Sequence, residues 1–186
     1  MSKHQAQRVG IFIDTQNIYH SAKNLYNAKV NFASVVKESL GERDLIRAIA
    51  YAITTETGEE QGFLDALENA EIEIKSKDLQ IFSGGAKKAD WDVGMAVDII
   101  KMAPKLDVVI IVCGDGDFIP LVEYLHHTFL MRVEVVAFGK STSGKLKDIA
   151  DKFIDLSENS RKFLLRPRRS SDGNNQRLAT PRTPRD

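Results

Sequence analysis

Short runs of apolar, β-branched residues alternate with helix-like segments along most of the chain, and this alternation restricts the fold more than any other feature. The clearest run is Val108–Val112, five consecutive β-branched residues that predict a strand buried on both faces. Strands that alternate with helices across short connections indicate an α/β fold, a three-layer sandwich with a mainly parallel central sheet. Further strands are predicted at residues 9–13, 45–53, 72–74, 133–138 and 153–156.

Between these strands, apolar residues recur at helical spacing. The predicted helices cover residues 18–26, 32–40, 62–70, 91–103, 118–129 and 146–150. The segment 91–103 is apolar nearly all round, which is typical of a buried helix. We therefore expect this helix to be covered on most of its sides.

Aspartates stand after two of the predicted strands. Asp14 follows the first strand, and Asp115 and Asp117 belong to the Gly-Asp-Gly-Asp turn that follows Val108–Val112. Right-handed crossovers place the loops after parallel strands along one rim of the sheet, where ligands bind. The three carboxylates therefore meet if the two strands are neighbours. Asp92, in the first turn of its predicted helix, could reach the same place.

Three or four carboxylates in one place would repel one another and raise each other's pKa. A divalent cation removes this conflict, and Mg²⁺ and Mn²⁺ prefer oxygen ligands. Each aspartate alone has an ordinary alternative, as a helix cap or a turn residue. Asp98 lies six positions after Asp92, about 9 Å along a helix, so one ion could not easily be held by both. Asp98 would support the site from outside or be buried with a polar partner.

Other residues in these motifs have more than one interpretation. Asn17 could cap its helix or hydrogen-bond a metal-bound water. Lys88 could be a solvated loop charge or could meet a phosphate beside the acids. Cys113, at the end of a strand, is interpreted as a small core residue. The Gly-x-Ser-x-Gly motif of serine hydrolases is absent from the sequence.

The formal net charge of zero conceals an asymmetry. Residues 161–186 contain eight Lys or Arg and two Asp or Glu, a net charge of +6, so residues 1–160 carry −6. We predict one domain over residues 1–160 and a basic, disordered tail over residues 161–186, where apolar residues are few and prolines recur. The acidic body would repel phosphate, which argues against a simple basic module that coats nucleic acid.

A single cysteine excludes a disulfide framework and a cysteine-rich zinc site. The first residues have no apolar segment of the kind found in signal peptides. No apolar run approaches the roughly 18–20 residues that a membrane span needs. We therefore expect a cytoplasmic protein with no membrane partner.

Three segments in consistent order resemble the NYN domain family, and more narrowly its bacterial LabA-like branch. They are Phe-Ile-Asp-Thr-Gln-Asn-Ile-Tyr at 12–19, Lys-Ala-Asp-Trp-Asp-Val-Gly-Met-Ala-Val-Asp at 88–98 and Val-Cys-Gly-Asp-Gly-Asp-Phe-Ile-Pro-Leu-Val at 112–122. The segments 141–146 and 150–156 also fit, so the resemblance spans residues 8–157. This family is similar in fold to PIN and FLAP nuclease domains, and its members are known or predicted metal-dependent ribonucleases.

The resemblance implies supporting roles for Asn17, Lys88 and Asp98 around an acidic metal site for Mg²⁺ or Mn²⁺. Asp90 departs from the family pattern as an extra acid, and the start of the predicted helix and the register of the motif favour Asp92 over it. The residues that the resemblance assigns to metal binding and catalysis are Asp14, Asp92, Asp115 and Asp117.

Together, these features predict a Mg²⁺- or Mn²⁺-dependent nuclease that acts on single-stranded RNA, uses water as the nucleophile and leaves 5′-phosphate ends. The sequence leaves open whether the protein forms a homodimer. The alternative is a non-catalytic module that binds RNA or protein through the same rim. A phosphatase of the haloacid dehalogenase type ranks lower, because it needs a second aspartate two positions after the first, and Gln16 stands there.

Overall fold

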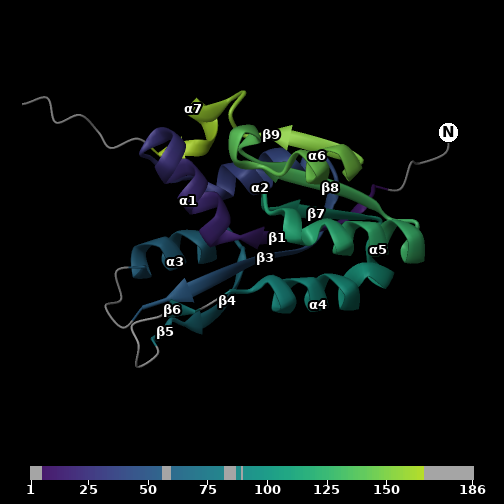
Figure 1. Ribbon diagram of the computed structural model, residues 1–186, viewed down its shortest axis with the longest axis horizontal. Helices are drawn as coiled ribbons and strands as arrows, with labels where there is room; N and C mark the ends of the chain where they lie inside the picture. Colours follow the sequence, from purple (N-terminus) through teal and green to yellow (C-terminus); the bar gives the residue numbers. More distant parts are fainter. Residues whose placement is uncertain (1–5, 56–59, 82–86, 89, 166–186) are drawn as a thin grey trace, which may run out of the picture.

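The computed structural model describes residues 6–55, 60–81, 87–88 and 90–165. Six strands form one sheet in the order β4-β3-β1-β7-β8-β9, and every neighbouring pair is parallel. This arrangement confirms the predicted α/β fold with a mainly parallel central sheet (Figure 1). The six strands are β1 (Arg8–Asp14), β3 (Asp44–Thr54), β4 (Glu73–Asp78), β7 (Val108–Val112), β8 (Arg132–Ala137) and β9 (Lys152–Asp155).

Helices cover both faces of this sheet, and Figure 1 shows α1 and α4 on opposite sides of it. No helix in the described part of the chain is long and apolar enough to cross a bilayer. One face carries α1 (Thr15–Tyr26), α2 (Phe32–Leu40), α3 (Gln61–Glu68) and α7 (Ser160–Phe163). The other face carries α4 (Asp92–Met102), α5 (Ile119–Phe129) and α6 (Gly144–Ile149).

Smaller elements connect these layers. Strands β2 (Lys29–Val30) and β10 (Leu164–Leu165) form one antiparallel pair, and β5 (Gln80–Ile81) and β6 (Lys87–Lys88) form another. Three short 3₁₀ turns, η1 to η3, cover Ala103–Lys105, Gly116–Phe118 and Gly139–Ser141. The last two lie in the loops after β7 and β8, at the carboxyl ends of the strands.

The apolar core is split in two by the sheet. Strand β7 contributes Val108, Ile110 and Val112 to the core on the α1 side, and Val109 and Ile111 to the core on the α4 side. All five side chains are fully buried. Burial of each contributes roughly 1.5–3 kcal/mol relative to an exposed position. A strand with both faces covered has no place for a polar side chain, which explains the uninterrupted β-branched run.

Helix α4 is less buried than its composition predicts, and the expectation of a helix covered on most sides is wrong. Met95 and Ile99 are fully buried against the sheet, but Val93 and Val97 are 74% and 41% exposed. The physical reason is the layer in which α4 lies. A helix in an outer layer contacts the sheet along one stripe only, whatever residues cover its other side.

The ends of α1 and α2 follow from their capping residues. Asp14 caps α1 by accepting a hydrogen bond from the backbone N–H of Asn17, so the helix begins at Thr15, three residues before its predicted start. Asn31 caps α2 in the same way through Ser34. Helix α2 ends at Leu40, and Gly41 is its C-cap residue. The φ of Gly41 is +61°, a conformation that glycine adopts at little cost.

The described fold continues to Leu165, five residues beyond the predicted boundary at residue 160. Phe163 and Leu164 are buried, and Leu164 pairs with Val30 of β2. The basic neighbours Arg161 and Lys162 are exposed, so charge alone did not show that this segment packs. The rest of the predicted tail, residues 166–186, lies outside the described residues.

Candidate active site

The strand order reverses at β1. From β1 the chain passes to β3 and β4 on one side of the sheet, and then to β7, β8 and β9 on the other. In open parallel sheets, ligands bind in the crevice outside the carboxyl ends of the strands at such a reversal. Ile13 of β1 pairs with Val112 of β7, so the two strands whose ends carry the aspartates are neighbours. We call the space between these strand ends the β1–β7 crevice.

Asp14 is the last residue of β1 and is largely enclosed. One carboxylate oxygen, Oδ1, accepts the N–H of Asn17 at 3.0 Å, and the other, Oδ2, accepts the thiol of Cys113 at 3.5 Å. Burial raises the pKa of Asp14, and the charge of Asp115 raises it further, while the backbone hydrogen bonds act in the opposite direction. Among the ion pairs of the described residues, none includes Asp14.

The loop after β7 holds the next two acids. Asp115 accepts the backbone N–H of Asp117 at 3.0 Å and so caps the 3₁₀ turn η2. Asp115 is half-buried and Asp117 is exposed. A Cβ atom on Gly114 would come within 2.9 Å of the hydroxyl oxygen of Thr142. Glycine therefore lets the loop after β8 pack closely against this turn.

Asn17 connects the two loops. Its side-chain oxygen accepts the N–H of Gly114 at 2.9 Å, a contact between residues 97 positions apart. Asp14, rather than Asn17, is the residue that caps α1. The Asn17 side chain thus ties the end of β1 to the turn that carries Asp115 and Asp117.

Asp92 does not follow a strand of the sheet but is the first residue of α4. Burial raises its pKa, and the negative charges of Asp14, Asp90, Asp115 and Asp117 raise it further. Asp92 therefore lies within electrostatic reach of the carboxylates at the ends of β1 and β7. Of the described residues, no cation forms an ion pair with it.

Asp98 points to other partners. It accepts hydrogen bonds from the hydroxyl of Tyr51 at 2.9 Å and from the ammonium of Lys75 at 2.5 Å. Burial acts to raise its pKa, but these two bonds together with the positive charges of Lys75 and Lys101 outweigh burial, and the net shift is downward. Of the two roles left open for Asp98, burial with a polar partner is the one observed. The backbone of Lys88 lies in β6, and its side chain lies outside the described part.

The comparisons with known proteins show the family and the fold of this chain. The sequence model of the NYN domain matches residues 8–158. The chain belongs to the NYN domain family. This family comprises nuclease-like proteins, as the resemblance predicted.

Two relatives of this NYN protein extend along most of its length. The low amplitude and bright protein LabA of Synechococcus elongatus is 25% identical over 158 residues, which are 81% of this chain and 84% of LabA. The crystal structure of VPA0982, a protein of unknown function from Vibrio parahaemolyticus, superimposes with a TM-score of 0.80 and 32% identity. That match covers 89% of this chain and 100% of the Vibrio chain. The resemblance to LabA and the fold class are thereby confirmed.

The acids of this NYN domain provide the kind of ligands that a hard cation takes. In Asp14 and Asp92, burial and neighbouring negative charge disfavour the anionic carboxylate, and none of the four acids forms an ion pair with a lysine or arginine in the described segments. Among the described residues, no three His, Cys, Asp or Glu side chains lie close enough together to hold one metal ion, so the four acids do not form a preassembled metal cluster. Mg²⁺ is commonly bound through one or two carboxylates and keeps several waters, so the donor set fits it.

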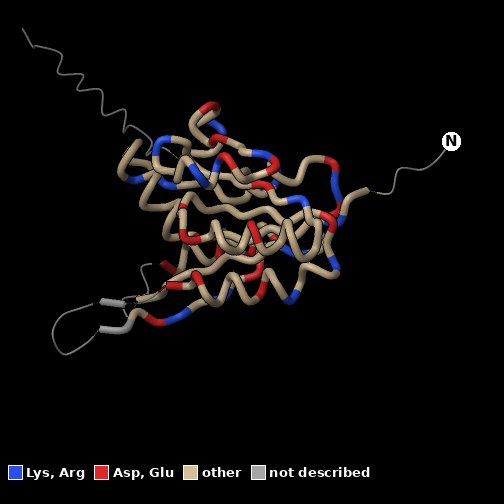
Figure 2. Tube along the Cα trace, turned by 45° about the vertical axis from the view of Figure 1, so that its right-hand side comes forward, with Lys and Arg blue, Asp and Glu red and all other residues tan. Residues whose placement is uncertain are grey.

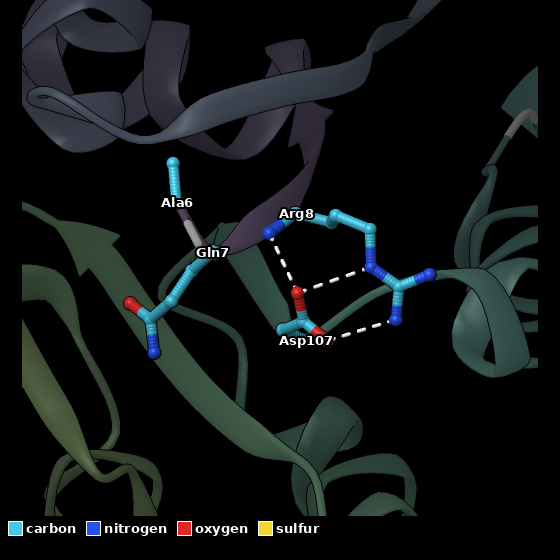
Figure 3. Close-up of a pocket in the computed structure, with 4 residues that line it drawn as sticks. All are labelled: Ala6, Gln7, Arg8 and Asp107. Carbon is cyan, nitrogen blue, oxygen red and sulfur yellow. Dashed lines mark hydrogen bonds and ion pairs between the residues drawn. The ribbon is translucent and has the colours of Figure 1, made fainter. Parts of the chain in front are cut away.

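A concavity lies at the other end of the same strands, away from the four acids. It is lined by Ala6, Gln7, Arg8 and Asp107 (Figure 3). The Arg8 guanidinium and backbone N–H donate three hydrogen bonds to Asp107 at 2.8–3.1 Å. Because these charges already satisfy each other, we assign no ligand to this concavity.

Two residues contribute more to the site region than the sequence suggested. Cys113 is fully buried, as a core residue should be, but its sulfur also donates to Asp14 and accepts the backbone N–H of Asp115 at 3.4 Å. The sequence feature that could have indicated this role is the position of Cys113 directly before the turn that carries Asp115. Trp91 precedes Asp92 and donates its indole N–H to the carbonyl of Ala52 at 2.8 Å.

The raised pKa of Asp92 leads to a stability prediction. A carboxyl group whose pKa is raised by folding destabilises the native state above that pKa, and this cost disappears as pH falls below the unfolded value of 3.8. In metal-free protein at pH 7, Asp92→Asn should therefore raise the melting temperature. Solvent screening keeps the effect small, about 1–3 °C for a chain of this size. Calorimetry between pH 3 and pH 8 measures it.

Asp107→Asn is the matched control, because the sign is opposite. Arg8 lowers the pKa of Asp107 to about 2. This pair therefore contributes stability above pH 3.8 that is lost as pH falls through about 2. The control should melt below wild type at pH 7. A lower melting temperature for Asp92→Asn at pH 7 would contradict the repulsion among the four acids.

Proposed function

We propose that this NYN protein is a Mg²⁺- or Mn²⁺-dependent ribonuclease that hydrolyses phosphodiester bonds of single-stranded RNA at the β1–β7 crevice. The observation that supports this proposal most is the convergence of acidic charge on the topological switch point of the sheet, with Asp92 affected by the acids of both strand ends. The residues that would bind the metal and act in catalysis are Asp14, Asp92, Asp115 and Asp117.

A bound divalent cation would supply two kinds of chemistry, a lowered pKa for its water and neutralisation of the charge that develops on the phosphate. The protein itself fixes the positions of the carboxylates. Asp14 is fixed by one donor on each oxygen, from Asn17 and Cys113. The Asn17–Gly114 hydrogen bond sets the spacing between Asp14 and the turn after β7. Preorganised groups of this kind need no rearrangement during the reaction.

The substrate must be anionic, and the crevice alone would repel it. A cation held by these carboxylates would reverse the local field and would allow a phosphate to approach. Figure 2 shows Lys and Arg positions interspersed with Asp and Glu positions along the described part of the chain. Lys140 and Lys145 are exposed in the loop and helix that follow β8, the strand next to β7. Together with Lys88, they are the lysines that we assign to phosphate contacts.

The test of catalysis uses labelled single-stranded RNA with Mg²⁺ or Mn²⁺. Wild type should cleave it and leave 5′-phosphate ends, and a chelator should stop the reaction. Asp14→Asn keeps the ability to cap α1, because asparagine caps helices as well as aspartate does. It should lower kcat by roughly 10²–10³-fold, the usual cost of losing one electrostatic group of an active site.

Asp44→Asn is the matched control, since Asp44 is an exposed aspartate at the amino end of β3, and the crevice lies at the carboxyl ends of the parallel strands. Its cleavage rate should equal that of wild type. A wild-type protein that binds RNA but cleaves none with either metal would favour the alternative, a regulatory module that binds RNA through the same rim.

We further propose that the basic tail, residues 166–186, adds affinity for RNA without contributing to the fold. Residues 166–186 contain six Arg and two Asp, a net charge of +4, and the described residues end at Leu165. Deletion of residues 166–186 should weaken RNA binding most at low salt, because contacts with phosphate lose strength as salt rises. Thermal unfolding should stay cooperative. Loss of the cooperative transition would show that the tail packs against the domain.

A further inference from the structure

The amino end of α4 is held by contacts that do not come from a helix cap. Its N-cap residue is Trp91, which makes no side-chain capping hydrogen bond. The indole N–H of Trp91 instead donates to the carbonyl of Ala52 in β3 at 2.8 Å. The first residue of α4 is Asp92, so the anchoring of Trp91 bears directly on the position of that acid.

Lys77 of β4 holds the same point from a second strand. Its ammonium lies 4.1 Å from the centroid of the Trp91 ring, a cation–π contact. The same ammonium donates to the carbonyl of Asp90 at 3.0 Å. Lys77 thus contacts both residues that precede Asp92, although its own side chain is on the surface.

The first turn of α4 lies against the Trp91 ring. A Cβ atom on Gly94 would come within 2.7 Å of that ring, so a glycine is needed for this approach. On the strand side, the Tyr51 ring lies 5.3 Å from the Trp91 ring, and its hydroxyl donates to Asp98 further along α4. The helix is therefore attached to the sheet at its first turn and again through Asp98.

We propose that Trp91 and Lys77 are positioning residues, which fix the amino end of α4 and thereby hold the Asp92 carboxylate at the β1–β7 crevice. The inference rests on the proposed metal-dependent function. Asp14, Asp115 and Asp117 follow directly from strand ends, whereas Asp92 arrives on a helix and depends on how that helix docks. Direct binding of RNA by Lys77 is the competing explanation. The geometry favours positioning, because the ammonium is already occupied by Asp90 and the ring.

The experiment compares Lys77→Met and Trp91→Phe with wild type in the full-length protein. Lys77→Met keeps the aliphatic stem and removes the charge, and Trp91→Phe keeps a ring and removes the indole N–H. Mn²⁺ affinity is measured by the electron paramagnetic resonance signal of free Mn²⁺, and RNA cleavage gives kcat and KM. We expect each variant to bind Mn²⁺ about tenfold more weakly, the lower end of what loss of a group that orients a metal ligand costs. The value of kcat should fall while KM for RNA stays unchanged.

Two further variants make the result specific. Lys77→Arg should restore most of the affinity, because arginine also donates hydrogen bonds and stacks on aromatic rings. Lys101→Met removes an exposed lysine near the other end of α4 and should behave as wild type. Lys77→Met is a surface change, so it keeps the test valid if Trp91→Phe folds poorly.

Three outcomes would overturn the inference. Unchanged Mn²⁺ affinity with a raised KM and weaker salt dependence in Lys77→Met would assign Lys77 to direct phosphate binding. Unchanged Mn²⁺ affinity and kinetics with a lower melting temperature would make the contacts structural only. A wild-type protein that binds no Mn²⁺ would overturn the proposed function and this inference together, which separates that failure from the first two.

Discussion

The parallel pairing of β1 with β7 is the interaction on which both the core and the candidate site depend. It brings together two strands whose apolar residues are buried, and their side chains fill the apolar layers on both faces of the sheet. The same pairing makes β1 the point at which the strand order reverses. Because Asp14 ends one strand and Asp115 follows the other, the contact that stabilises the core also places like charges next to each other.

The protein holds this unfavourable charge through hydrogen bonds rather than through ion pairs. Asp14 is supported by Asn17 and Cys113, and Asp115 by the backbone of its own turn. Those described basic residues that form ion pairs do so with other acids, such as Lys75 with Asp98 and Arg43 with Glu134. Such an arrangement costs stability in the metal-free state and leaves the carboxylates available to a cation.

The sequence was sufficient where the determining interactions are local. The β-branched run at Val108–Val112 predicted its strand, because that signal lies within the strand itself. The aspartates after two strands indicated a common rim only if those strands are neighbours, and the pairing of β1 with β7 joins segments far apart in the chain. The sequence was insufficient where the decisive contact is distant. The bond from Asn17 to Gly114 spans 97 residues, and the anchor of Trp91 on Ala52 spans 39. Neither leaves a periodic signal. The prediction that α4 is covered on most of its sides was wrong for a related reason, since the apolar composition of the helix does not show which side contacts the sheet.

The central claim is that the β1–β7 crevice binds a divalent cation, and the thermal stability of wild type and Asp117→Asn with and without Mn²⁺ tests it most directly. At Mn²⁺ concentrations 100-fold above the dissociation constant, wild type should gain about 2.7 kcal/mol, or roughly 5–10 °C in melting temperature. Without metal, Asp117→Asn should be as stable as wild type or more so, since one repelling charge is removed, and with Mn²⁺ it should gain less. An Asp117→Asn protein that loses stability without metal, while both proteins respond equally to Mn²⁺, would contradict the claim.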